Sequence, residues 1–283
     1  MKIKTFFRGI VGLFLITTVL SCKKEESEKV LKPENLEDIA YDTHAQTTMD
    51  VYLPEGRTDT TRVIFLLHGG YWSAGDKDEL TEQAKYYRGK GFAVVNMNYK
   101  LSGTDENNVH PTQMNDIHQA VNFVASKASE WHISKEKFGM GGISAGAHLA
   151  LLYTYGYNTT NKIKAVVSLA GPTNFTDTRG IGAEQAAAVE AFLGASFMDN
   201  PALYVQASPS SRVSSLSKPT LFIHGTNDIV VPVTQSEDLH VKLNGLNVTN
   251  KLIMYDSGHE VFTTTNTQEI LDEIEKWFRL YIK

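Results

Sequence analysis

One stretch of the sequence reads Lys137-Phe138-Gly139-Met140-Gly141-Gly142-Ile143-Ser144-Ala145-Gly146. The fold prediction begins from this stretch. A short strand is predicted at Lys137–Met140, and the pattern Gly-x-Ser-x-Gly follows it and opens a helix predicted at Ala145–Tyr153. A serine on a very tight turn between strand and helix needs glycine two positions before and after it, because a side chain there would clash. The pattern alone is weak, since a glycine-rich turn without activity has the same letters. In this context it predicts a nucleophilic serine at Ser144.

The chain around this motif alternates short apolar segments with longer helix-like ones. Strands are expected at Asp38–Tyr41, Thr48–Leu53, Arg62–Leu67, Ala93–Met97, Lys137–Met140, Ala165–Leu169, Thr220–His224 and Lys251–Tyr255. Further helices are expected at Glu79–Lys90, at Val233–Leu243, around Met114, Ile117, Val121, Val124 and Ala128, and in a closing segment with the buried face Ile270, Ile274, Trp277, Phe278 and Tyr281. Near-continuous apolar strands are typical of strands buried on both faces. The alternation predicts one domain at residues 37–283 with a mostly parallel sheet and helices on both faces.

The composition excludes several classes of protein. With 42% hydrophobic and 21% charged residues, the 283-residue chain can bury a sizeable core, which excludes general disorder. Its net charge of −5, without a basic block at the centre of the chain, gives no electrostatic support for a nucleic-acid partner. A single cysteine excludes internal disulfides and a cysteine-rich zinc module.

The N-terminus has the pattern of an export signal. Lys2, Lys4 and Arg8 precede the apolar run Ile10–Leu20, which is well short of the ~20 apolar residues that span a membrane. The run ends in Val19-Leu20-Ser21-Cys22, which resembles the lipobox of bacterial lipoproteins, whose cysteine carries the lipid. We therefore expect a signal peptide at residues 1–21 and lipidation of Cys22. An ordinary signal peptide with an incidental cysteine is the alternative.

Residues 22–36 are expected to be the lipidated cysteine and a flexible, charge-rich tether. Lys23 follows Cys22, whereas an aspartate there favours inner-membrane retention in the lipoproteins that this segment resembles. The resemblance therefore implies an exported protein anchored at the outer membrane, facing either the periplasm or the cell surface.

Serine needs a base that takes its proton, and a carboxylate that orients this base. Beyond the helix predicted at Ala145–Tyr153, three histidines follow Ser144, namely His224, His240 and His259. Only His259 lies on a loop directly after the last predicted strand, and Asp228 lies just beyond the preceding one. The chain order Ser, Asp, His is the order of one hydrolase class, so Ser144, Asp228 and His259 are the predicted triad. His224 is expected to hold the loop that carries Asp228.

A nucleophilic serine also needs backbone N–H groups that stabilise the developing oxyanion. One donor is expected from Ala145, directly after the serine. The loop His68-Gly69-Gly70-Tyr71-Trp72 follows an early strand, and its glycines allow a close approach of the backbone to a substrate. Gly70 and Tyr71 are the other expected donors, and His68 is expected to brace the loop. A plain glycine turn is the alternative.

These motifs together resemble the α/β-hydrolase fold over about residues 40–283, in the esterase–lipase group with an H-G-G-x-W oxyanion loop. The subgroup includes bacterial feruloyl and acetyl esterases and kynurenine formamidase-like enzymes. Asn98-Tyr99-Lys100-Leu101 resembles its Y-R-L segment with Lys100 in place of arginine, and Asp116 resembles the acid that pairs with that arginine. The resemblance implies a carboxylic ester hydrolase that acts through an acyl-enzyme on small or carbohydrate-linked acyl groups.

Residues 173–212 lie between two predicted strands and resemble the short cap of this family. A cap would line the substrate site, and packing at the sheet edge is an equally weighted alternative.

Other activities have weaker support in the sequence. The nine histidines are scattered and no H-E-x-x-H pattern occurs, so neither a metal site nor a cofactor is expected. A serine peptidase of the oligopeptidase type and an aryl formamidase share the motifs, and a non-catalytic surface binding protein on a hydrolase scaffold is the alternative of another class. The expected partners are a small-molecule or glycan ester and, through Cys22, a membrane.

Overall fold

The structure is a computed structural model that describes residues 1–5, 30–103, 108–262 and 265–283. The expected lipidation site Cys22 and most of the expected signal peptide lie outside the described residues. Within these described ranges, no helix combines the length and apolar character needed to cross a bilayer.

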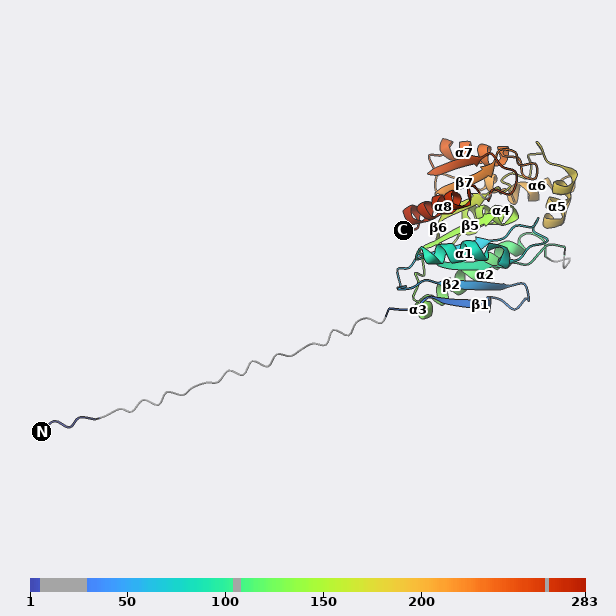
Figure 1. The fold of residues 1–283 in the computed structure, drawn as a ribbon. Helices are drawn as coiled ribbons and strands as arrows, with labels where there is room; N and C mark the ends of the chain where they lie inside the picture. Colours follow the sequence, from blue (N-terminus) through green and yellow to red (C-terminus); the bar gives the residue numbers. More distant parts are fainter. Residues whose placement is uncertain (6–29, 104–107, 263–264) are drawn as a thin grey trace.

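The described part of the chain forms one eight-stranded sheet in the order β1-β2-β4-β3-β5-β6-β7-β8. The strands are β1 (Glu34–Ala40), β2 (Thr48–Leu53), β3 (Val63–Leu67), β4 (Ala93–Met97), β5 (Phe138–Ile143), β6 (Ile163–Leu169), β7 (Thr220–Gly225) and β8 (Asn250–Tyr255). Pairing is antiparallel between β1 and β2 and between β2 and β4, and parallel from β4 onward. The mostly parallel sheet predicted from the alternation of strands and helices is confirmed (Figure 1).

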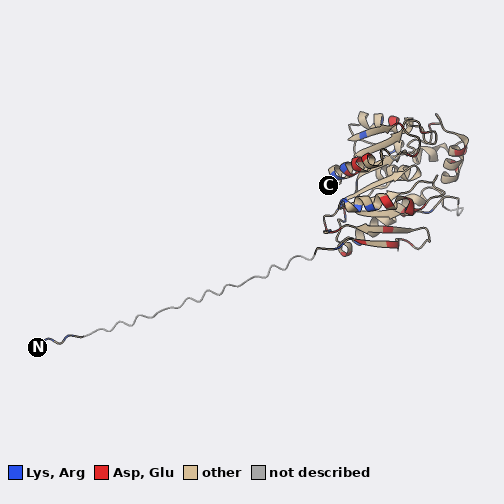
Figure 2. Ribbon diagram, viewed as in Figure 1, with Lys and Arg blue, Asp and Glu red and all other residues tan. Residues whose placement is uncertain are grey.

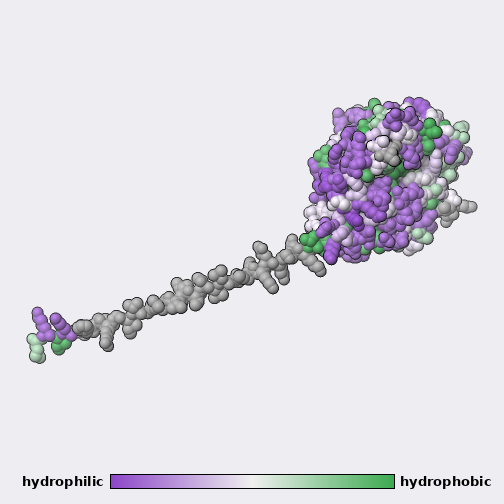
Figure 3. Space-filling view, in the orientation of Figure 1, coloured by the Kyte–Doolittle hydropathy of each residue, from purple (hydrophilic) through white to green (hydrophobic). Residues whose placement is uncertain are grey.

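Helices cover both faces of the sheet. They are α1 (Thr81–Gly89), α2 (Thr112–Ser126), α3 (Ala128–Trp131), α4 (Ala145–Leu152), α5 (Ala183–Leu193), α6 (Pro201–Gln206), α7 (Thr234–Gly245) and α8 (Thr267–Tyr281). Buried residues of α1 and α8 pack on one face, and those of α2, α4 and α7 pack on the other. The outer surfaces of α1 and α8 carry charges of both signs, and the face in Figure 3 is mostly hydrophilic (Figures 2 and 3).

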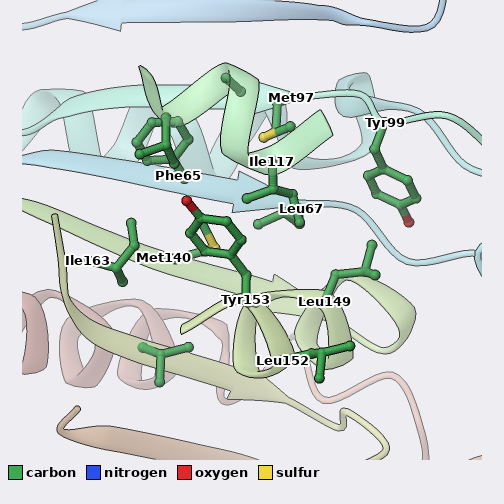
Figure 4. Packing of buried hydrophobic residues seen from close by; sticks show 14 of the residues in the cluster. Phe65, Leu67, Met97, Tyr99, Ile117, Met140, Leu149, Leu152, Tyr153 and Ile163 are labelled. Carbon is green, nitrogen blue, oxygen red and sulfur yellow. The ribbon is translucent and has the colours of Figure 1, made fainter. Parts of the chain in front are cut away.

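Helix α4 lies at the centre of the second face and is buried along its whole length. Its Leu149 and Leu152 belong to the same buried cluster as Tyr153 and Met140 of β5 (Figure 4). A helix that is apolar on all sides is a core helix, and close packing leaves it little freedom to shift. The residue that precedes α4 therefore has a rigid support.

The N-terminal boundary of the domain differs from the expected one. β1 begins at Glu34, so the tether expected at residues 22–36 is too long at its C-terminal end, and the domain does not begin at residue 37. Glu34 pairs with Leu53 across the ladder, and its carboxylate accepts a hydrogen bond from the buried Arg57 at 2.9 Å. β1 is an edge strand with mostly exposed polar side chains, so it lacks the apolar pattern that marks interior strands.

Candidate active site

Ser144 occupies the turn between β5 and α4 with φ +54° and ψ −120°, a conformation that costs a non-glycine residue about 1–3 kcal/mol. Its N–H donates to the Leu169 carbonyl at 2.8 Å. A Cβ on Gly142 would lie 2.4 Å from the Gly146 backbone, and one on Gly146 would lie 2.2 Å from the Leu67 carbonyl oxygen. The two glycines therefore allow β5, α4 and β3 to meet at this turn.

Replacing Gly146 with alanine should lower both activity and stability. The added methyl collides with the backbone of β3, which cannot rotate away, and such overpacking typically destabilises by 1–3 kcal/mol. Thermal unfolding and ester turnover measure the effect. Gly89→Ala is the matched control, because a Cβ there meets no atom within 4 Å. Equal melting temperatures for both variants would contradict the crowding argument.

The structure brings the three predicted triad residues together. The Ser144 Oγ lies 2.9 Å from His259 Nε2, and His259 Nδ1 lies 2.8 Å from Asp228 Oδ2. They follow β5, β8 and β7, three parallel strands whose carboxyl ends meet at one edge of the sheet. In the tautomer that fits these contacts, Nδ1–H donates to the carboxylate and Nε2 accepts the serine O–H. This is the hydrogen-bond chain that activates a serine for attack.

Asp228 is held by more groups than His259 alone. Its Oδ1 accepts the N–H groups of Val230 and Val231 at 2.8 and 2.9 Å, and its Oδ2 lies 3.2 Å from His224 Nε2. Burial alone would raise the pKa of Asp228, but hydrogen bonds from His224, His259 and Val231 outweigh it and hold the pKa well below its ordinary value. The carboxylate is therefore ionised at any pH near neutrality.

His224 lies where the sequence places it, beneath the loop that carries Asp228. Its Nε2 also lies 2.9 Å from the Val231 carbonyl oxygen, and its Nδ1 lies 2.7 Å from Ser236 Oγ. The ring is fully buried, so it connects the two ends of this loop out of contact with solvent. The direct contact of His224 with the carboxylate has no signal in the sequence.

The loop His68–Trp72 lies against Ser144: a Cβ on Gly69 would be 3.4 Å from the Ser144 Cβ. Gly70, Tyr71 and Trp72 all have positive φ values, +105°, +51° and +60°. Among the described residues, the backbone N–H groups of Gly70, Tyr71 and Ala145 donate to no protein acceptor. The three expected oxyanion donors are thus unpaired and close to the serine, as a site for a developing negative charge requires.

His68 lies behind this loop. Its ring stacks on Tyr99 with the centroids 4.4 Å apart, and its Nδ1 lies 2.8 Å from the Gly69 carbonyl oxygen. Burial lowers the pKa of His68 and outweighs the Gly69 hydrogen bond and nearby carboxylates, which raise it. These contacts place the ring as a support of the loop.

Lys100 and Asp116 form an ion pair at 3.1 Å, and the Asp116 carboxylate also accepts the Lys100 N–H at 2.8 Å. Neither residue lines the cavity beside Ser144, so the pair supports the fold. No cluster of three or more His, Cys, Asp or Glu side chains suited to a metal ion occurs within the described ranges.

A cavity of about 210 Å³ opens beside Ser144 and Ala145. Its walls come largely from the segment 172–206, which contains α5 and α6, and from the loop after β7. They include Phe175, Ile181, Val189, Phe197, Tyr204 and Val230, whereas His259 is not among the described residues that line it. The segment expected as a cap therefore lines the cavity. The sequence predicts this segment but not which of its side chains line the cavity, because they converge only after folding.

Comparisons with known proteins show which family and fold this chain resembles. The model of the BD-FAE family matches residues 49–243. The probable carboxylic ester hydrolase LipM of Mycobacterium tuberculosis is 26% identical over 192 residues, covering 63% of this chain and 44% of LipM. Kynurenine formamidase of Danio rerio is 30% identical over 143 residues, covering 49% of this chain and 46% of the relative. The chain thus spans less than half the length of these curated relatives.

Solved structures with the same fold are more completely covered. A truncated carbohydrate esterase from gut microbiota has a TM-score of 0.75 and 22% identity, over 87% of this chain and 96% of that one. An acetyl ester-xyloside bifunctional hydrolase from Caldicellulosiruptor lactoaceticus has a TM-score of 0.69 and 21% identity, over 82% of this chain and 88% of that one. This likeness confirms the α/β-hydrolase fold expected from the three motifs.

Proposed function

The chain belongs to the BD-FAE family, and we propose that it is a serine esterase acting on carboxylic esters of small or carbohydrate-linked acyl groups. The observation that carries the proposal is the chain of two hydrogen bonds from Ser144 through His259 to Asp228, beside three unpaired backbone N–H groups. Relatives described as a carboxylic ester hydrolase and an esterase support the reaction class.

The geometry supports acyl transfer in two steps. His259 Nε2 takes the Ser144 proton as Oγ attacks the ester carbonyl, and Asp228 stabilises the imidazolium that forms. The N–H groups of Gly70, Tyr71 and Ala145 bind the oxyanion. As the tetrahedral intermediate collapses, His259 returns the proton to the alcohol, which leaves. His259 then deprotonates a water molecule, which releases the acid from Ser144 by the same route.

We assign the cavity to the acyl group. The leaving alcohol must accept a proton from His259, and His259 is not among the described residues that line the cavity. The cavity instead adjoins Ser144, Ala145 and Tyr71, where the acyl carbon and its oxyanion would lie. Its largely apolar wall and volume of about 210 Å³ suit acyl groups larger than acetyl. The alcohol then extends toward solvent, which is compatible with a glycan.

Turnover of p-nitrophenyl acetate, butyrate and hexanoate by the purified protein, with fluorophosphonate labelling, tests the reaction class. A panel of acetylated glycans, feruloyl esters and formylkynurenine tests the substrate. Formylkynurenine is included because a kynurenine formamidase is among the relatives, and its preferential turnover would replace the esterase proposal with an aryl formamidase. Labelling without turnover of any ester, but with peptide cleavage, would favour the peptidase alternative. Absence of labelling would favour a binding protein.

We also propose that the protein is exported and anchored at the outer membrane by a lipid on Cys22. The support is the order of charged residues, apolar run and Leu-Ser-Cys in the sequence. Cys22→Ser should abolish incorporation of labelled palmitate and release the protein from the membrane fraction, whereas Ser27→Ala, in the expected tether, should change neither. Membrane-bound, unlabelled wild-type protein would argue against lipidation.

A further inference from the structure

One buried histidine has no role in the proposed chemistry. It connects three parts of the site: helix α4, the oxyanion loop and the cap. His148 is fully buried in α4, four residues after Ser144. Its Nδ1 lies 3.1 Å from the indole Nε1 of Trp72, the last residue of the oxyanion loop. Its Nε2 lies 2.8 Å from the Ala207 carbonyl oxygen, which follows α6 of the cap. One ring therefore bonds to the loop and to the cap at the same time.

The partners of His148 determine its proton position. An indole N–H can only donate and a carbonyl can only accept, so Nδ1 must be the acceptor and Nε2 must carry the hydrogen. A protonated ring would place a second N–H against the indole donor. Burial lowers the pKa of His148 to about 3, outweighing the Ala207 hydrogen bond, which raises it. The neutral ring is thus a stable acceptor for Trp72.

The ring is also fixed relative to the nucleophile. The backbone N–H of His148 donates to the backbone carbonyl of Ser144 at 3.0 Å, as part of the first turn of α4. The neighbouring Trp72 stacks on Phe192 of α5 with the centroids 4.7 Å apart, and Phe175 lies 4.6 Å from the His148 ring. The loop position is therefore tied to the same helix that begins at the serine.

The oxyanion loop needs such a support. Tyr71 and Trp72 both adopt positive φ values, which side chains disfavour, so the loop would relax if nothing held it. Its backbone N–H groups also lack protein acceptors among the described residues. Two side-chain hydrogen bonds hold the end of this loop: the Trp72 indole donates to His148, and the Ser102 hydroxyl donates to the Trp72 carbonyl. Of the two, the indole bond links the loop to α4.

Building on the proposed acyl transfer, we propose that His148 is a positioning residue that holds the Gly70–Trp72 loop in register with Ser144 through the Trp72 indole. Through Trp72 it pre-organises the N–H groups of Gly70 and Tyr71 for the oxyanion. Both acylation and deacylation pass through an oxyanion, so loss of this support should lower kcat whichever step limits the rate. Substrate affinity should change less than kcat, because the substitutions alter none of the described wall residues of the cavity except Trp72.

The test uses His148→Leu, which removes both hydrogen bonds, and Trp72→Phe, which removes the indole donor and keeps an aromatic ring. Each should lower kcat for p-nitrophenyl butyrate on the order of 10²-fold, with KM within about threefold. The double variant should be no slower than the slower single one, because both changes remove one interaction. His148→Gln can accept from Trp72 and donate to Ala207, so it should restore most of kcat.

Rates are divided by the number of sites that a fluorophosphonate titrates, so that misfolded protein does not count. His118→Leu is the matched control: His118 of α2 contacts Tyr153, which follows α4, and it lies outside the site, so this variant should keep kcat. A kcat per titrated site within about threefold of wild type in His148→Leu would overturn the proposal. If that variant does not fold, a wild-type kcat in Trp72→Phe would overturn it. A wild type that neither turns over esters nor reacts with the probe would instead overturn the proposed function.

Discussion

Ser144→Ala is expected to lower kcat for p-nitrophenyl butyrate by 10⁴-fold or more, while the protein stays folded. The Oγ is the only atom that forms the acyl bond in the proposed reaction, so without it the remaining groups can assist only direct attack by water. Loss of a triad serine removes on the order of 10⁴ to 10⁶ in kcat, and the oxyanion donors and substrate binding leave a small residual rate.

Measurement of kcat with the fluorophosphonate label separates this loss from unfolding. Ser144→Ala should also lose the label, with an unchanged melting temperature. Ser168→Ala is the matched control: this serine is buried in β6, and its Oγ has no hydrogen-bond partner in the described part of the chain. It should keep both label and turnover. Equal turnover by Ser144→Ala and wild type would refute the triad assignment.

Asp228→Asn is expected to lower kcat on the order of 10⁴-fold, because the asparagine holds His259 in the tautomer that cannot act as the base. The Val230 and Val231 N–H groups contact Oδ1, so the amide oxygen of an asparagine takes that place and its NH₂ faces His259. His259 Nδ1 must then accept a hydrogen bond and Nε2 must carry the proton. An Nε2–H cannot take the Ser144 proton. The NH₂ group also replaces the oxygen that His224 Nε2 faces, so this variant loses that contact as well.

The pH dependence of stability gives this variant a second readout. A carboxylate whose folded-state pKa is depressed contributes stability above its unfolded value of about 3.9, and this contribution is lost as the pH falls through the folded-state pKa. The gap in unfolding free energy between wild type and Asp228→Asn should therefore be widest above about pH 4 and narrow below it. Asp238→Asn, an exposed residue paired with Arg179, is the control and should keep kcat. A gap that widens in acid would contradict the assigned direction of the Asp228 pKa.

Much of the fold follows from local patterns. The interior strands β3 and β4 agree with their predicted ranges to within a residue, because strands buried on both faces have near-continuous apolar runs. β2 matches its predicted range, which rested on an alternating pattern. β5 extends to Ile143, three residues beyond its predicted end, since the sheet continues through Gly141 and Gly142. Glycine pairs indicate a turn in a sequence, whereas here they let the strand approach β6 and α4 closely.

The candidate triad could also be placed from the sequence. A serine between two glycines, an acid beyond one strand and a histidine beyond the next occur in the order that parallel strands bring to one edge. The geometry of the oxyanion loop is less accessible. The sequence indicates that Gly70 can adopt a positive φ, but the positive φ values of Tyr71 and Trp72 depend on what packs around them.

Three features can be read directly from the sequence: the strand–helix alternation, the turn at Ser144 and the chain order of the three triad residues. Each depends on a local pattern within a strand or just after it. Three further features appear only in the folded molecule: the walls of the cavity beside Ser144, the contact of His224 with Asp228, and the bond from Trp72 to His148, which joins residues 76 positions apart. Side chains from distant segments meet only when the sheet has assembled and its helices have packed, and such contacts leave no periodic signal along the chain.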